Sequence, residues 1–308
     1  MSDVRVGTRA SVLALTQTRL FMSQLVREHP QLTLSEVHIQ TAGDLSTAPL
    51  NTATEPGLFV SALRDALLAG EVDIIVHSMK DLPAAPMPGI VTACVPARND
   101  SRDGLVSTNN LTLAELPPGA VVGTSSPRRT ASVRSIRPDL RVIPIRGNVD
   151  SRIAKVHRGE FDATILAMAG LNRIDRADEV CEIFESDRFV PAAGQGALSI
   201  ECRATDSELI SLVSTLDDAY TRLTTAAERS VLLGLGAGCA TAIGAVSRFE
   251  SGTLHLTAQL SIEENGESEL VEVSAPLDLT DLGGASQLGL HVARLLLSSP
   301  IATRAVWT

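Results

Sequence analysis

The sequence of 308 residues has few aromatic residues, few lysines and no long uninterrupted apolar segment. A helix that spans a membrane needs roughly 18 to 20 consecutive apolar residues, and no run approaches that length. The first residues also lack the apolar core of a secretory signal, so we expect a cytoplasmic protein that does not enter a membrane. With 44% hydrophobic residues, the chain is long enough to build two or three folded domains.

The four cysteines are far apart and form no CxxC pair. Closely paired cysteines are typical of zinc sites and disulfide frameworks, so we predict neither a metal site nor a disulfide. A free cysteine is by default a small buried hydrophobe, and we interpret Cys94, Cys181 and Cys202 in this way.

The formal net charge of −10 argues against general nucleic-acid binding. Residues 98–176 depart from this average, because basic residues outnumber acidic ones there. We therefore predict that this segment binds anions. Only two of the 26 basic residues are lysines, Lys80 and Lys155. Since lysine and arginine are not interchangeable where a compact charge is needed, Lys80 is predicted to have a specific role.

Short β-branched runs alternate with amphipathic stretches over the first 200 residues, which is typical of an α/β fold with parallel strands. The pattern restarts after Arg98 and predicts a second α/β domain, whereas the last third predicts an α+β domain. The predicted strands are 4–7, 35–41, 73–76, 120–123, 141–145, 163–166, 197–202, 242–249, 253–262 and 268–275, and the predicted helices are 11–27, 58–69, 127–136, 149–157, 219–233 and 281–297.

A cation and a carboxylate, Lys80 and Asp81, follow a short apolar strand that is predicted to be buried. Ligands of open α/β sheets gather at the carboxyl ends of the strands. At such a position Asp81 can stabilise a developing cation and transfer a proton, and we predict a catalytic role for it. The alternative is a surface ion pair that contributes little. His77 has no partner at metal-ligand spacing and is predicted to be structural.

Residues 123–129 place a strand end, three hydroxyl groups and a proline at a helix start, followed by two arginines. Free backbone N–H groups and guanidinium groups both favour a carboxylate or phosphate there. The alternative is a serine N-cap beside a solvated arginine pair. With further arginines after the next strand, at Arg146 and Arg152, anion binding is the better interpretation.

Three residues of the first strand-to-helix turn, Arg5, Arg9 and Ser11, are predicted to close the same crevice from the other domain. Two facing basic walls imply an acidic ligand between them.

Cys239 lies in the glycine-rich segment 234–241. Glycine permits backbone conformations that expose a neighbouring side chain to a cleft. No histidine or asparagine partner marks Cys239 as an activated nucleophile, so the pattern alone leaves a buried thiol and a reactive one both open.

Six segments together resemble the porphobilinogen deaminase family, in the same order and along nearly the whole chain. The resemblance implies two α/β domains, like those of periplasmic binding proteins, that flank a cleft, and a smaller α+β C-terminal domain. The implied domains are 1–98 with 193–216, 99–192, and 217–308. The six segments are 5–11, 76–83, 123–129, 146–149, 193–197, and 238–239 before 243–244.

The resemblance implies a transferase of tetrapyrrole and heme biosynthesis, which joins four porphobilinogen molecules head-to-tail into hydroxymethylbilane and releases ammonia. It implies that Cys239 holds one dipyrromethane cofactor per chain through a thioether. Asp81 would stabilise the cationic azafulvene and mediate proton transfer. Every pyrrole carries an acetate and a propionate, which accounts for the many arginines.

The resemblance also assigns roles to the other candidate residues, and it implies a monomer with no nucleic-acid, membrane or metal partner. The implied cofactor-binding residues are Cys239, Lys80, Thr124, Ser125, Ser126, Arg128, Arg129 and Arg146, and the implied substrate-binding residues are Arg5, Arg9, Ser11, Arg152, Arg173 and Gln195.

Two alternatives remain. A solute- or effector-binding module with two α/β lobes and a basic cleft fits the same pattern but has no covalent cofactor. An inactive relative with the same fold is the other, because two loops depart from the family pattern. The loop 42–56 has no lysine, and Ala240, Thr241 and Ala242 follow Cys239 where the family commonly has glutamine and proline.

Intact-protein mass separates the enzyme from the binding module. The purified chain is expected to be heavier than its sequence by one dipyrromethane, because the thioether survives purification, and Cys239→Ser is expected to abolish the increment. A chain at its bare sequence mass that also leaves porphobilinogen unconsumed would contradict the enzyme.

Overall fold

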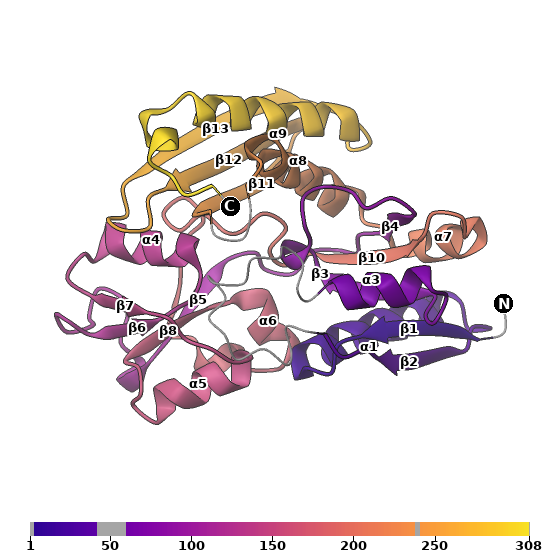
Figure 1. Cartoon of the computed structure of the whole chain (residues 1–308), viewed down its shortest axis with the longest axis horizontal. Helices are drawn as coiled ribbons and strands as arrows, with labels where there is room; N and C mark the ends of the chain where they lie inside the picture. The colour runs from indigo at the N-terminus through magenta and orange to yellow at the C-terminus, as the bar shows by residue number, and fades with distance from the viewer. Residues whose placement is uncertain (1–2, 42–59, 238–240, 308) are drawn as a thin grey trace.

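The structure is a computed structural model that describes residues 3–41, 60–237 and 241–307. In this part of the chain, three β-sheets each pack against their own helices (Figure 1).

The first sheet has the strand order β2-β1-β3-β10-β4. Strands β1, β2 and β3 are parallel, whereas β10 runs antiparallel between β3 and β4. Successive side chains of β3 point to opposite faces, so Ile74 and Val76 pack with α1 and α7 while Ile75 packs with α3. The bounds are β1 Val4–Thr8, α1 Val12–Glu28, β2 Leu34–His38, α3 Ser61–Leu68, β3 Ile74–Ser78, β4 Ile90–Cys94, β10 Leu198–Arg203 and α7 Ser207–Val213.

The second sheet has the order β7-β6-β8-β5-β9, with β6, β7 and β8 parallel and β5 antiparallel to both of its neighbours. Val133 of α4 packs with Ile165 on one face, and Ile153 of α5 packs with Leu166 on the other. The bounds are β5 Asp103–Ser107, β6 Val121–Gly123, α4 Pro127–Ile136, β7 Arg141–Ile143, α5 Val149–His157, β8 Ala163–Ala167, α6 Met168–Arg173 and β9 Glu182–Ile183.

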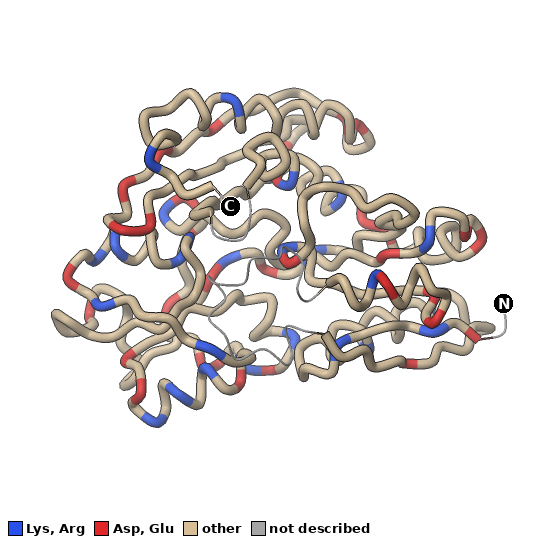
Figure 2. Tube along the Cα trace, in the orientation of Figure 1, with Lys and Arg blue, Asp and Glu red and all other residues tan. Residues whose placement is uncertain are grey.

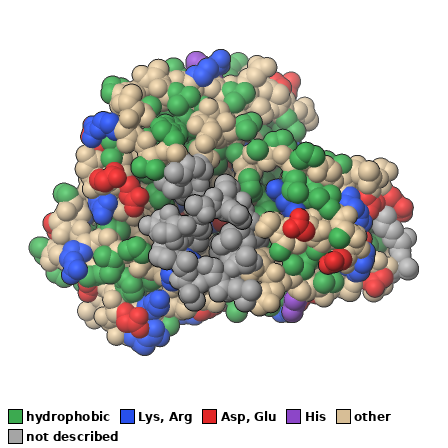
Figure 3. Space-filling view, viewed as in Figure 1, with side chains coloured by type: hydrophobic (Ala, Val, Ile, Leu, Met, Phe, Trp, Pro, Cys, Tyr) green, Lys and Arg blue, Asp and Glu red, His purple; other side chains and the backbone are tan. Residues whose placement is uncertain are grey.

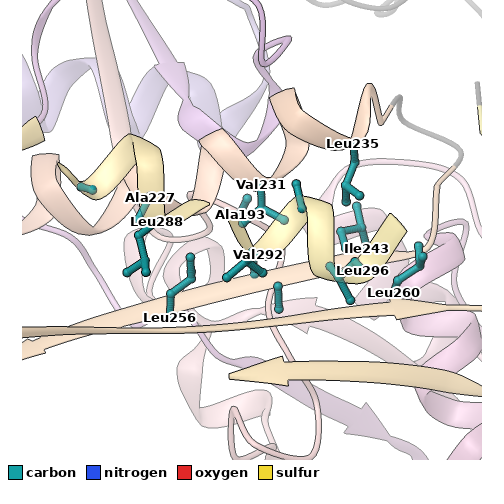
Figure 4. Close-up of a cluster of buried hydrophobic side chains, with 14 of the residues drawn as sticks. Ala193, Ala227, Val231, Leu235, Ile243, Leu256, Leu260, Leu288, Val292 and Leu296 are labelled. Carbon is teal, nitrogen blue, oxygen red and sulfur yellow. The ribbon is translucent and has the colours of Figure 1, made fainter. Parts of the chain in front are cut away.

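The third sheet is an antiparallel meander of β11, β12 and β13. Helices α8 and α9 cover one of its faces, where Val231, Leu256 and Val292 belong to one core (Figure 4). Helix α4 of the second domain contacts β11 and β12. The bounds are α8 Ala219–Leu235, β11 Ile243–Glu250, β12 Thr253–Ser261, β13 Ser268–Pro276 and α9 Leu282–Leu297.

Side-chain caps start several helices at defined residues. Ser11, Ser126 and Asn148 each accept a hydrogen bond from a backbone N–H in the first turn of α1, α4 and α5. Asp218 and Asp281 do the same for α8 and α9. Such a cap contributes on the order of 1 kcal/mol. Three of these caps lie at strand-to-helix turns where the sequence predicts anion binding.

The predicted fold class is confirmed: two mixed α/β sheets are combined with a small antiparallel C-terminal sheet domain. Every predicted strand and helix is present in the structure, with ends that differ by a few residues. The chain returns to the first sheet through β10. The domain boundaries at residues 98, 192 and 216 stay a prediction. The elements that sequence reasoning missed are β4, β5, α6, β9 and α7.

Charges of both signs are spread along all three parts of the fold (Figure 2). On the face shown in Figure 3, basic and acidic side chains alternate with hydrophobic ones and form no large patch of one sign. Within residues 3–41, 60–237 and 241–307, no helix has the length and hydropathy that crossing a membrane requires.

A buried ion pair ties α3 to the returning strand β10. Arg64 donates from Nε and Nη2 to the two carboxylate oxygens of Glu201, at 2.9 and 2.6 Å. Nε2 of buried His77 lies 3.5 Å from the same carboxylate, which supports the structural role predicted for this histidine. Burial by itself raises the pKa of Glu201, but Arg64 and His77 outweigh it and lower the pKa from 4.5 to about 2.

Glu201→Gln is expected to lower the free energy of unfolding at pH 7 by about 3 kcal/mol, because Arg64 stays buried without its counter-charge. In the native protein the folded pKa is lowered, so the stabilisation is present above pH 4.5 and is lost as the pH falls toward about 2. The variant should therefore lose stability less steeply than the native protein over this range. Urea unfolding at pH 7 and in acid measures both effects.

Glu36→Gln is the control, since its partner Arg19 is exposed. We expect a loss below about 1 kcal/mol there. If the stability of Glu201→Gln falls with decreasing pH as steeply as that of the native protein, Glu201 is not the source of this pH dependence.

Candidate functional site

The first half of the candidate site lies at the carboxyl end of β3. The strand runs directly into a short 3-10 turn, η2 (Met79–Asp81). The backbone N–H of buried Met79 donates to the carbonyl of Ala197, which fixes the start of the turn against the segment before β10. Lys80 is half-buried, and Asp81 is exposed. The predicted position of both residues at a strand end is confirmed.

The second half begins where β6 ends, at the start of α4. The backbone N–H of Ser126 donates to Oγ1 of Thr124, and Oγ of Ser126 accepts from the N–H of Arg129. Oγ of Ser125 donates to the carbonyl of Ile145 at 2.8 Å. All three hydroxyl groups therefore shape the loop itself, in addition to any role toward a ligand.

Arg128 and Arg129 are buried rather than solvated, so the alternative of a solvent-exposed arginine pair is wrong. Nη2 of Arg128 lies 2.8 Å from Oδ2 of Asp103, and Nη2 of Arg129 lies 2.6 Å from Oδ1. Their Nη1 atoms donate to the carbonyls of Val190 and Ile165. One buried carboxylate thus holds both guanidinium groups at the start of α4.

Gln195 connects this carboxylate to the first half of the site. Its Nε2 donates to Oδ1 of Asp103 at 2.9 Å and to the carbonyl of Ser101, while its Oε1 accepts from Nζ of Lys80 at 3.1 Å. Burial alone raises the pKa of Asp103, but Arg128, Arg129 and Lys80 outweigh it and hold the pKa well below its usual range. Asp103 is therefore ionised at neutral pH.

Positive charge exceeds negative charge where the two halves meet. Burial and the nearby Arg129 lower the pKa of Lys80 to about 8. Burial, Arg129 and Arg146 lower the pKa of Arg152 to about 10, while Asp81 acts in the opposite direction. Residues from both domains therefore lie within electrostatic range of one another. An anionic ligand would relieve the repulsion among these cations.

Two guanidinium N–H groups of this cluster are buried and have no hydrogen-bond partner among the described residues. They are Nε of Arg129 and Nε of Arg146. An unsatisfied buried donor costs about 1–3 kcal/mol, and a carboxylate oxygen would satisfy it. A cofactor or substrate with several carboxylates would provide hydrogen-bond partners for these two donors.

The remaining predicted residues lie on several different elements. Nε of Arg152 donates to the carbonyl of Gly147, and Nη2 of Arg173 donates to the carbonyl of Gly196 at 2.7 Å. Arg9 follows the carboxyl end of β1, and Ser11 caps α1.

Arg5 is not brought together with the others. It lies near the amino end of β1, and its guanidinium group makes a bidentate ion pair with Asp73, with Nε and Nη2 at 3.0 and 2.9 Å from the carboxylate oxygens. Asp73 precedes β3 and also pairs with Arg203. The structure therefore accounts for Arg5 as part of an ion-pair network at the opposite end of the parallel strands.

Cys239 and the loop 42–56 lie outside the described residues. Two of the three other cysteines are small buried hydrophobes as predicted: Cys94 and Cys202 are fully buried, and burial raises the pKa of both thiols to about 12. Cys181 is half-buried, and its thiol donates to the carbonyl of Leu105. Within the described ranges, no three His, Cys, Asp or Glu side chains are arranged to hold a metal ion.

Sequence reasoning missed Asp103, which organises the two arginines. The available signal was a carboxylate at the head of the apolar run Gly104–Val106, since a charge in a buried strand requires a cation partner. The contacts that Glu228 and Arg229 of α8 make with other parts of the fold were not predicted either, because charged residues on a helix usually face solvent.

Two family models together match most of the chain. Residues 4–211 match "Porphobilinogen deaminase, dipyromethane cofactor binding domain", and residues 222–298 match "Porphobilinogen deaminase, C-terminal domain". The chain belongs to the porphobilinogen deaminase family. Its activity is that of a porphobilinogen deaminase with a dipyrromethane cofactor, in tetrapyrrole biosynthesis. The alternative of a solute-binding module is therefore wrong for this chain.

Curated porphobilinogen deaminases resemble the chain over nearly its full length. The protein of Thermobifida fusca (strain YX) is 43% identical over 296 residues, which is 96% of this chain and 92% of the relative. That of Acidothermus cellulolyticus is 43% identical over 312 residues, 98% of this chain and 93% of the relative. Among solved structures, the OxyR regulatory domain from Pseudomonas aeruginosa covers 69% of this chain and 95% of its own, with a TM-score of 0.40 and 16% identity.

Asp103→Asn is expected to lower the free energy of unfolding by about 3–5 kcal/mol, because two buried guanidinium groups lose their carboxylate. Urea unfolding at pH 7 measures the loss. The matched control is Asp100→Asn, whose partner Arg102 is half-buried, and the expected loss there is below about 1 kcal/mol. Equal losses in the two variants would contradict the organising role of Asp103.

Proposed function

We propose that Asp81 is the catalytic residue of this porphobilinogen deaminase and that the cation cluster around it holds carboxylated pyrroles. The observation that carries the proposal is the arrangement at the strand ends. Asp81 is an exposed carboxylate within electrostatic range of Lys80 and Arg152. The same cation cluster holds two buried guanidinium donors that have no hydrogen-bond partner among the described residues. Catalytic carboxylates are expected where charge develops in the reaction.

The reaction joins four porphobilinogen molecules head-to-tail. In each addition the aminomethyl carbon–nitrogen bond of the substrate breaks, ammonia leaves, and the remaining carbon becomes electron-poor. The Asp81 carboxylate stabilises this positive charge. After the new carbon–carbon bond forms, the pyrrole carbon loses its proton, which a carboxylate oxygen of Asp81 accepts. Water finally releases hydroxymethylbilane.

The dipyrromethane cofactor supplies the terminal pyrrole carbon that attacks the first substrate. We propose that Cys239 holds it through a thioether, since α8 ends at Leu235 and leads directly into the segment that contains this cysteine. No activating histidine is required, because the thiol is alkylated once and then kept.

Carboxylate recognition follows from the donors of the cluster. Lys80, Arg129 and Arg146 are proposed to bind acetate and propionate groups of the cofactor, with the loop of Thr124, Ser125 and Ser126 as support. Arg128, whose Nη atoms are bound within the protein, positions Arg129 through Asp103. The residues proposed to contact substrate are Arg9, Ser11, Arg152, Arg173 and Gln195.

We also propose a monomer that acts in the cytoplasm. The resemblance of the sequence to the family supports both proposals.

Asp81→Asn is expected to reduce turnover of porphobilinogen by at least about 100-fold, because the amide neither stabilises the positive charge nor accepts the proton. Ammonia release and tetrapyrrole formation measure turnover, and circular dichroism checks the fold. The control is Asp65→Asn, an exposed carboxylate on α3 of the same sheet, which should keep native turnover. Near-native turnover of Asp81→Asn would refute the assignment.

A further inference from the structure

Helix α8 of the third domain reaches the turn that carries Lys80 and Asp81. Nη1 of Arg229 donates to the carbonyl of Met79 at 3.1 Å and to that of Leu82 at 3.3 Å. Nη2 of the same side chain donates to the carbonyl of Pro83. The planar guanidinium fork thus binds the backbone on both sides of Asp81.

Arg229 is half-buried, and it binds the turn through backbone carbonyl groups. Burial lowers the pKa of Arg229. Among the described residues, Arg229 donates to three carbonyl oxygens and forms no ion pair within 4.0 Å. The guanidinium group therefore acts on the structure through the backbone of the turn, while Glu201 supplies a nearby negative charge.

Met79 and Leu82 of the turn segment are buried, but one side of the segment borders open space. A pocket of about 320 Å³ lies there, lined by Met79, Leu82 and Pro83 of the turn segment and by Arg229 itself. A backbone segment that borders open space has room to shift once its hydrogen bonds are removed.

The helix that holds the turn is itself firmly fixed. Glu228, next to Arg229 in sequence, is fully buried and accepts two hydrogen bonds from Arg98, at 2.7 and 3.0 Å. It also accepts from the backbone N–H groups of Gly194 and Ser247. The carboxylate of Glu228 therefore anchors α8 to the segments that connect the first two domains.

We propose that Arg229 is a positioning residue that fixes the backbone of the turn that carries Asp81. Helix α8 carries Arg229, so an element of the C-terminal part of the chain locates the carboxylate. The proposal rests on the proposed catalytic role of Asp81. It goes beyond that role by making the third domain part of the catalytic geometry.

Arg229→Gln tests the proposal, with Arg222→Gln as the matched control. Arg222 lies on the same helix, pairs with Asp217, and donates to the carbonyl of Ala93 in the first domain. The Arg222→Gln variant therefore shows what is lost when an arginine of α8 no longer contacts the first sheet at a place distant from the turn. Each variant is assayed for kcat, KM, melting temperature and the mass increment of the cofactor.

Because small displacements of a reacting group slow catalysis strongly, Arg229→Gln is expected to lower kcat by about 10- to 100-fold with KM and the mass increment unchanged. Arg222→Gln should keep kcat within about twofold of native, even with a similar fall in melting temperature. Arg229→Lys retains the charge and one donor direction, so its kcat should lie between the native and Arg229→Gln values.

A kcat of Arg229→Gln equal to that of Arg222→Gln overturns the proposal, provided that the native protein is active and Asp81→Asn is not. If Asp81→Asn retains turnover, the catalytic assignment itself fails. If Arg229→Gln does not fold, the comparison moves to Arg229→Lys and Arg222→Lys, and equal kcat values in that pair overturn the proposal in the same way.

Discussion

A carboxylate removed from water must be matched by cations, and the candidate site depends on that requirement at Asp103. This carboxylate is fully buried and accepts hydrogen bonds from Arg128, Arg129 and Gln195. Two guanidinium groups bring more positive charge than one carboxylate cancels, and Lys80 adds to the surplus through Gln195. The network that stabilises the start of α4 therefore also creates the excess of cations that an acidic pyrrole can balance.

The features that were predictable from sequence have strong local signals. The caps at Ser11 and Ser126 and the apolar strand before Lys80 and Asp81 depend on neighbouring residues alone. Strand β5 was missed because Asp103 opens it, and the arginines that neutralise this carboxylate lie 25 and 26 residues further along the chain. No short sequence window contains both members of that contact.

The misplacement of Arg5 has a geometric cause. Arg5 and Arg9 look equivalent in a sequence motif, but four residues of an extended strand span about 13 Å. One side chain is therefore at the amino end of β1, in contact with Asp73, and the other follows its carboxyl end. The roles of Glu228 and Arg229 were hidden for another reason, since periodicity predicts which face of a helix is apolar but not which charged residues another domain will bury.

The position of β10 has a consequence for how the protein is made. This strand lies between β3 and β4 in the first sheet, yet it is synthesised only after every strand of the second sheet. Until then β3 and β4 lack the neighbour that joins them, and Glu201, the partner of Arg64, is absent. The strands of the second sheet are thus all synthesised before the first sheet is complete, and the contacts of Arg229 with the turn that carries Asp81 form later still.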